Sequence, residues 1–199
     1  MTLRRRFCAA LAALFAVALS ARAAPLIEPA KKVREYVDEI TAVHITVAAD
    51  PLVFARERSD LAANARDYVT LAPLEINRTG KRSYYWSGYL WTTIDRRDGD
   101  PLLKRGDQLV LIADGRPIPL VSDDKPLREH GVGQTPVRVP VRSALPVLFA
   151  ADLEVIDYVA HATEVHVEWI REGTSEPLPL WKDGRTGLRA FLERLQAGR

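Results

Sequence analysis

The chain has 199 residues, of which 47% are hydrophobic and 27% are charged, and its formal net charge at pH 7 is +2. This length and composition are those of one ordinary globular domain. The single cysteine, Cys8, excludes an internal disulfide, and the sequence contains neither an internal repeat nor a low-complexity tract.

The N-terminal residues have the features of a secretory signal peptide. Residues 4–6 are three arginines, residues 7–19 are apolar and rich in Ala and Leu, and residues 21–23 read Ala-Arg-Ala, which fits a small-x-small cleavage site. The apolar segment is shorter than the roughly 18 residues that a membrane span needs. We therefore expect residues 1–23 to be removed, residues 24–199 to form a single globular domain, and the mature protein to reside in the periplasm.

Removal of the signal peptide changes the charge of the protein. The segment contains four arginines and no acidic residue, so the formal charge falls from +2 to −2, and Cys8 is lost with it. A near-neutral protein has no general electrostatic attraction for nucleic acid or anionic lipid. We expect no nucleic-acid partner, no membrane span after cleavage, and no disulfide or thiol chemistry in the mature chain.

The first part of the mature chain predicts one helix and two strands. Residues 25–40 become a short helix in this prediction, because apolar residues recur there at spacings of three and four (Val33, Tyr36, Val37, Ile40). Residues 43–47 alternate apolar and polar side chains, which predicts a half-buried strand, and residues 52–56 predict a second strand. Residues 59–67 fit a helix and a strand equally well.

Residues 69–76 show a change of strand phase at a proline. Val69 and Leu71 are odd-numbered and Leu74 and Ile76 are even-numbered, so in a regular strand the two pairs would point to opposite faces. Pro73 lies between the two pairs. A slip of one residue beside a proline is typical of a β-bulge or of a kink at a sheet edge. Residues 77–80 then predict a turn, and residues 95–106 predict a charged loop.

Residues 84–94 predict a strand with aromatic side chains on both faces. Even-numbered positions are purely apolar and predict a core face (Tyr84, Trp86, Leu90, Ile94). Odd-numbered positions add hydroxyl groups and an indole to their aromatic bulk, which suits a half-hydrated surface or contact with a second layer (Tyr85, Ser87, Tyr89, Trp91, Thr93).

Residues 109–113 and 116–121 predict a hairpin, because they flank Asp114-Gly115, a pair preferred in type I′ turns. Three segments contain prolines two or four residues apart, namely 116–121, 136–142 and 177–180. Because the missing N–H groups of each segment fall on one side, each segment is predicted to be an edge strand. One open sheet has only two edges, so three edge strands favour two packed sheets. Polyproline-like connectors are the alternative for some of these segments.

Helices and one further strand complete the prediction. Residues 146–161 place apolar residues along one helical stripe, residues 163–170 alternate as a strand, and Leu188, Phe191, Leu192 and Leu195 form the stripe of a C-terminal helix with Thr186 as its N-cap. The fold class that we predict is α+β and strand-rich, with an antiparallel β-sandwich-like core, one or two covering helices and a C-terminal helix.

Motifs for catalysis and metal binding are missing from the sequence. No Gly-x-Ser-x-Gly turn is present, and the segment 131–135 lacks the lysine of a phosphate-binding loop. The histidines have no metal-binding spacing (His44, His130, His161, His166). We therefore assign no catalytic residue, no metal ligand and no cofactor, while carboxylates far apart in sequence can still meet in a cleft.

Function is predicted from the odd-numbered face of the aromatic strand. Tyr85, Tyr89 and Trp91 either form a binding platform or pack beneath another layer, and both interpretations stay open. We predict a non-catalytic exported protein that binds a protein partner or a cell-envelope component. A carbohydrate-binding module that uses the three rings, and a hydrolase built from dispersed Asp, Glu and His residues, are the alternatives.

Overall fold

A computed structural model describes residues 32–94, 107–123 and 125–198. The predicted signal peptide and the predicted loop 95–106 lie outside these residues. The described part is α+β and strand-rich, with ten strands and two helices, and the strands form a large antiparallel sheet. The elements are β1 (Val33–Val37), β2 (His44–Ala48), β3 (Leu52–Glu57), β4 (Arg66–Arg78), β5 (Lys81–Thr92), β6 (Gln108–Ala113), β7 (Arg116–Leu120), β8 (Leu145–Ala151), α1 (Leu153–His161), β9 (Val165–Arg171), β10 (Thr174–Lys182) and α2 (Arg185–Ala197).

The sheet branches at β4. One edge of β4 pairs with β5 along its whole length, in a continuous register from Asp67↔Thr92 to Arg78↔Lys81. The opposite edge pairs first with β3 and then, from Leu74 onward, with β2. Pro73 lies between these two partners and pairs with neither. The predicted bulge or sheet-edge kink at Pro73 is therefore wrong in both forms, because the register with β5 is continuous and β4 lies inside the sheet. The proline marks a change of partner.

Both faces of β4 are buried, which explains the apparent change of phase. Val69 and Leu71 belong to a first core, which lies between the curled sheet and the helices. Leu74 and Ile76 belong to a second core on the opposite face. Odd-numbered residues of β4 are apolar where the first core covers them, and even-numbered residues are apolar where the second core covers them. The resulting sequence pattern resembles that of a bulged strand, although the strand is regular and lies between two layers.

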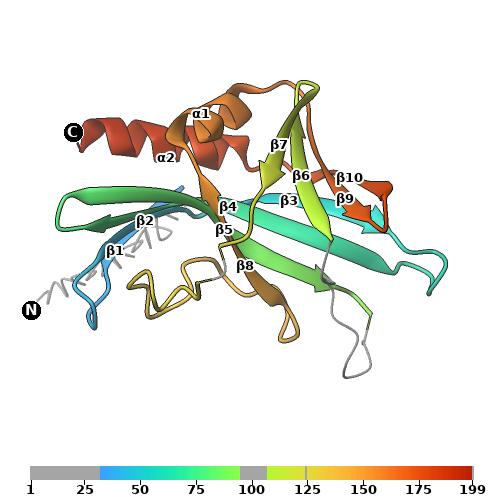
Figure 1. Ribbon diagram of the computed structural model, residues 1–199, viewed down its shortest axis with the longest axis horizontal. Coiled ribbons are helices and arrows are strands. Elements are labelled where there is room, and N and C mark those ends of the chain that lie inside the picture. The colour runs from blue at the N-terminus through green and yellow to red at the C-terminus, as the bar shows by residue number, and fades with distance from the viewer. Residues whose placement is uncertain (1–31, 95–106, 124, 199) are drawn as a thin grey trace, which may run out of the picture. The chain divides into compact units, whose positions relative to one another are not determined.

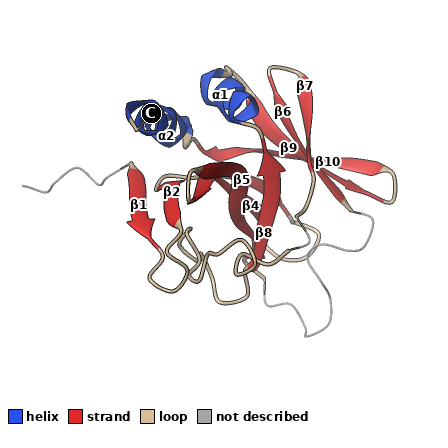
Figure 2. Ribbon diagram, turned by 60° about the vertical axis from the view of Figure 1, so that its left-hand side comes forward, coloured by secondary structure: helices blue, strands red, loops and turns tan. Residues whose placement is uncertain are grey.

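The first core is enclosed by strands from both halves of the sheet. Beyond β3 the strand order continues through β10, β9, β6 and β7, and an isolated bridge between Ser122 and Phe149 links the chain after β7 to β8. The predicted stripe of α2 is confirmed, since Leu188, Phe191, Leu192 and Leu195 are all buried in this core. Figure 2 shows α1 and α2 side by side over the sheet.

The predicted hairpin is confirmed, and β7 is the edge strand that its prolines predict, whereas β10 is a strand that lies between β3 and β9. Asp114 and Gly115 both have positive φ, 45° and 78°, as a type I′ turn requires, and β7 has β6 as its one strand partner in the described chain. In β10 the prolines lie in the half that pairs with β9 alone. Residues 136–142 are not a strand in the described structure.

Two helix predictions are wrong in part. Residues 33–37 form β1, because pairing with β2 over five residues overrides a weak helical spacing. Residues 145–151 form β8 against β5, and α1 begins only at Leu153. The N-cap of α2 is Gly184 rather than Thr186. Neither described helix is long and apolar enough to cross a membrane.

A long irregular segment covers the face of the sheet that the helices leave free. We name residues 125–144 the covering loop. Figure 1 shows this loop, in yellow, on the side of the β4–β5 hairpin opposite to α1 and α2. Leu127, Val132, Val137 and Ala144 of the loop pack in the second core. The part of the odd-numbered face of β5 around Tyr89 therefore lies beneath a second layer of chain.

Candidate functional site

Tyr89 is buried beneath the covering loop. Its side chain is 2% exposed, its ring belongs to the second core, and its hydroxyl donates a hydrogen bond of 3.0 Å to the carbonyl oxygen of Val137. A phenol buried with its hydroxyl paired in this way contributes to packing. Tyr89 is thus a support for the covering loop and offers no open ring to a ligand.

Asp38 fixes the covering loop to the turn between β1 and β2. Its carboxylate accepts hydrogen bonds from the backbone N–H of Gly133 at 2.7 Å and of Ile40 at 3.1 Å. Thr41 adds a hydrogen bond from its hydroxyl to the carbonyl oxygen of Gly131. The N–H of Gly133 is the main reason that the pKa of Asp38 lies below its usual value. These bonds hold the loop across the sheet.

Tyr85 is half-buried and faces His130, which in turn contacts Asp123; neither residue is a neighbour that strand periodicity predicts. Its hydroxyl lies 3.2 Å from Nδ1 of His130, and Nε2 of His130 lies 3.1 Å from Oδ2 of Asp123. Burial, followed by the charge of Asp123, raises the pKa of Tyr85. The phenol therefore stays protonated at neutral pH, which suits a structural hydrogen bond better than nucleophilic chemistry.

Trp91 stacks on Tyr68, its direct partner on β4. The ring centroids are 3.9 Å apart and the ring planes differ by 5°. The indole N–H of Trp91 donates a hydrogen bond of 3.1 Å to the hydroxyl of Thr70. Stacking and hydrogen bonding together fix the orientation of Trp91, and cross-strand aromatic pairs of this kind stabilise the sheet.

Trp181 of β10 extends this pair to the surface. Its ring meets Tyr68 edge-on at 6.4 Å and 84°, and the guanidinium of Arg66 lies 4.7 Å from its centroid. The side chain is 58% exposed. The register of β10 against β3 shifts between Leu180 and Lys182, and such an irregularity redirects the side chain at its centre. We name Tyr68, Trp91, Trp181 and Arg66 the aromatic cluster.

The structure does not bring the three predicted rings together as one open surface. Tyr89 is covered, Tyr85 faces His130, and Trp91 joins the aromatic cluster. Sequence reasoning missed Tyr68, Trp181 and Arg66 because they come from β4 and β10, whose approach depends on the order of strands in the sheet. The one signal in the sequence was Trp181 itself, an indole directly after a proline-rich strand.

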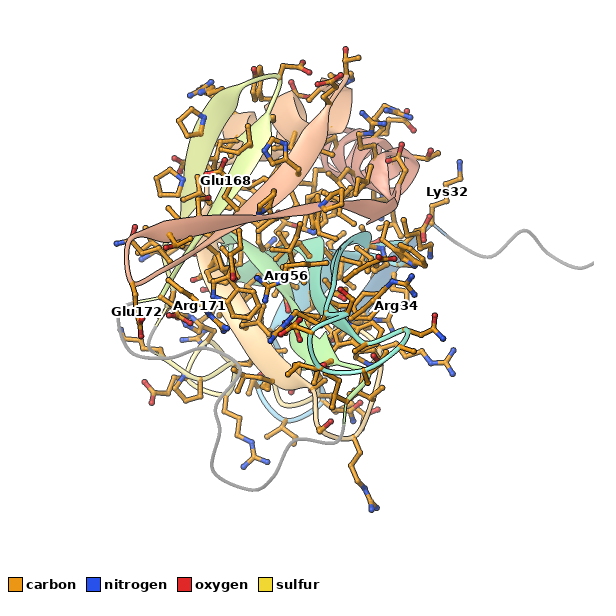
Figure 3. All side chains as sticks on the ribbon, turned by 90° about the vertical axis from the view of Figure 1, so that its right-hand side faces the viewer. Lys32, Arg34, Arg56, Glu168, Arg171 and Glu172 are labelled. Atoms are coloured by element: carbon orange, nitrogen blue, oxygen red, sulfur yellow. The ribbon has the colours of Figure 1, made fainter. Side chains whose placement is uncertain are left out.

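Two pockets in the described structure each contain at least two acidic residues, as a hydrolase with dispersed Asp, Glu and His residues would require. The first, of about 520 Å³, contains Arg56 and Arg171, both labelled in Figure 3, with Glu57, Asp60 and Glu176. The second, of about 400 Å³, contains Glu35, His44 and Glu75. Each of these carboxylates is paired with an arginine: Glu57 with Arg66, Asp60 with Arg58, Glu176 with Arg56, Glu35 with Arg194, and Glu75 with Arg82.

Carboxylates neutralised in this way are typical of structural ion pairs, so we do not place the candidate site in either pocket. Within the described residues, no group of three His, Cys, Asp or Glu side chains is arranged to hold a metal ion. Comparison with known proteins finds no matching family model, no matching curated protein and no matching solved structure.

Proposed function

We propose that this chain is an exported, non-catalytic periplasmic protein that binds another protein through the aromatic cluster. The observation that carries the proposal is the 58% exposure of Trp181 beside Arg66, on a base of stacked rings. Trp, Tyr and Arg are the residue types that contribute most free energy at protein interfaces. Export is inferred from the signal-peptide features of residues 1–23.

The aromatic cluster is held in place before any partner binds. Trp91 is fixed by Tyr68 and by Thr70, and Arg66 forms an ion pair of 2.8 Å with Glu57. Because these side chains lose little conformational freedom on binding, more of the contact free energy remains available for affinity. The fixed orientation of these side chains therefore favours their use as a protein-binding surface.

A protein partner suits the cluster better than a sugar does. Sugar rings stack on open aromatic faces, whereas one face of Trp91 lies against Tyr68 and Arg66 lies over Trp181. Tyr89, the central ring of the predicted sugar platform, is buried. These contacts favour an interface with edge-on aromatic and arginine contacts over a carbohydrate-binding platform.

We also propose that the two halves of the sheet act as the two layers of a sandwich, joined through β10. In support, the first core combines Val69 and Leu71 of β4 with Leu111 of β6 and Val167 of β9. In a sandwich these inner faces pack against one another, and the outer face of β4 and β5 is left to carry the covering loop and the aromatic cluster.

Photo-cross-linking in living cells tests the proposal. A benzophenone amino acid replaces Trp181 in the full chain, and a second strain carries it at Ile40, which is 85% exposed in the turn after β1. The proposal predicts a discrete adduct from position 181 that disappears when Arg66→Ala is added. Position 40 should give no adduct of the same mass, although it is the more exposed of the two.

Two results would contradict the proposal. An absence of any adduct from position 181, in cells where the protein is folded and exported, would remove the aromatic cluster as a contact surface. Equal adducts from positions 181 and 40 would show that exposure alone determines the reaction. The export part is tested separately, by the N-terminal residue of the purified mature protein, which we expect to be Ala24.

A further inference from the structure

A pocket of about 580 Å³ lies between β8 and the covering loop. Its lining is mainly apolar, with contributions from both elements (Leu127, Val132, Leu145, Pro146, Val147, Leu148). Pockets of about this volume with an apolar lining and a few polar groups are the usual sites for small organic ligands. The pocket shares no residue with the aromatic cluster, so it stands independently of the proposed protein-binding function.

The pocket also carries positive charge that no described residue neutralises. Lys125 and Arg128 line it, both are exposed, and neither forms an ion pair with any described residue. Asp123 is the acidic residue among the described lining, and its carboxylate already lies 3.1 Å from Nε2 of His130. The polar part of a complementary ligand is therefore an anion.

Hydrogen bonds on several sides hold the pocket open in one shape. The backbone N–H of Asp123 donates to the carbonyl oxygen of Leu148 at 2.8 Å, which fixes one end of the loop against β8. The bonds from Gly133 to Asp38 and from Tyr89 to Val137 fix the other end. A preformed pocket binds its ligand without first having to order the chain around it.

We propose that this pocket binds a single-chain amphiphile with an anionic head group. The acyl chain lies along the apolar residues of β8 and the loop, and the head group meets Lys125 and Arg128. The apolar lining excludes a small hydrophilic anion, because such a ligand would leave the greater part of the pocket unfilled. The unpaired cations exclude a purely apolar ligand as the preferred occupant.

Titration calorimetry with four probes of equal chain length tests this assignment on the mature protein. Dodecanoate and dodecyl phosphate should bind at one site, dodecanol about tenfold more weakly, and dodecyltrimethylammonium not at all. The two anionic probes separate a carboxylate from a phosphate as the preferred head group. The tenfold difference is what two exposed ion pairs of about 0.7 kcal/mol each provide.

Variants locate the binding. Lys125→Ser with Arg128→Ser should weaken dodecanoate about tenfold and leave dodecanol unchanged. Arg138→Ser is the matched control, because Arg138 is an exposed arginine of the same loop that does not line the pocket. Leu145→Asp places a carboxylate in the lining at a side chain that is 39% exposed, and it should abolish binding of the anionic probes while the protein stays folded.

Three outcomes would overturn the proposal. The first is no saturable binding of dodecanoate or dodecyl phosphate. The second is equal affinity for the anionic, neutral and cationic probes, which would mean that the head group is not recognised. The third is an equal loss with Arg138→Ser, which would mean general attraction to a basic loop. None of these outcomes bears on the adduct from position 181, so the two proposals fail independently.

Discussion

Gly88 illustrates at the residue scale how closely β5 approaches β4. A Cβ atom at this position would lie 1.7 Å from the carbonyl oxygen of Thr70, where a methyl group cannot fit. We expect Gly88→Ala to destabilise the fold by about 3 kcal/mol or more, the upper end of the range for overpacking, because backbone and not a flexible side chain must move.

The measurement for Gly88→Ala is the free energy of unfolding in urea, or the soluble yield if the variant does not fold. Gly198→Ala is the control, because its added Cβ would meet only ordinary contacts of 3.6 Å or more. A Gly88→Ala protein as stable as the wild type would contradict the close approach of β4 and β5. A glycine inside a strand ordinarily weakens it, whereas the close approach of the Thr70 carbonyl makes glycine a requirement at position 88.

Asp67 is the second residue whose role depends on its partners. Its carboxylate is 1% exposed and lies 2.9 Å from both Arg56 and Arg58. Burial acts to raise its pKa, but the hydrogen bonds from Arg56 and Arg58 outweigh this effect and hold the pKa below the usual value. Removing the charge takes away the partner that Arg56 and Arg58 share, although Arg56 keeps Glu176 and Arg58 keeps Asp60, so Asp67→Asn should destabilise by about 1–3 kcal/mol.

The pH dependence of this effect has a defined sign. Because the pKa of Asp67 is lower in the folded state, its contribution is complete above the ordinary aspartate pKa of about 4 and is lost as pH falls through the lower folded value. Urea unfolding at pH 7, 5 and 3 should show the same gap between wild type and Asp67→Asn at pH 7 and pH 5 and a narrower gap at pH 3. Asp60→Asn, at the exposed partner of Arg58, should change little. A gap that persists unchanged at pH 3 would disprove the assignment.

At the scale of elements, the covering loop depends on Asp38. We expect Asp38→Ala to release the loop, because the N–H of Gly133 and the turn at Ile40 both lose their acceptor. Amide hydrogen exchange at neutral pH should rise in residues 131–137 and remain unchanged in β3, which packs in the first core. Unchanged exchange in the loop would mean that its apolar side chains alone hold it on the sheet.

Elements whose signal is local could be predicted from the sequence. The β6–β7 hairpin follows from Asp114-Gly115, and α2 follows from a regular apolar stripe. The strands β1 and β8 could not be predicted, because their partners β2 and β5 decide them. The double burial of β4 was also invisible, since the covering loop that buries its second face lies some fifty residues later in the chain.

At the scale of the whole molecule, the fold places two parts of the aromatic strand β5 in different environments. The covering loop closes the part of β5 around Tyr89, while the part around Trp91 meets β4 and β10 at the surface. Trp91 is among the candidate residues predicted from the sequence. Trp181 and Arg66 could not be connected with it, because a pairing order that brings β10 next to β3 cannot be read from side-chain periodicity.

The most direct test of the central claim is the affinity of the partner captured from position 181 for variants of the purified mature protein. We predict that Trp181→Ala weakens binding by about 30-fold or more, the loss expected for a central interface residue. Ile40→Ala should bind as the wild type does. Trp181→Ala should lose only the roughly 1 kcal/mol that its contacts with Tyr68 and Arg66 provide, and both variants should remain folded at the temperature of the binding measurement. Binding of Trp181→Ala with wild-type affinity would contradict the account and remove the aromatic cluster as the binding surface.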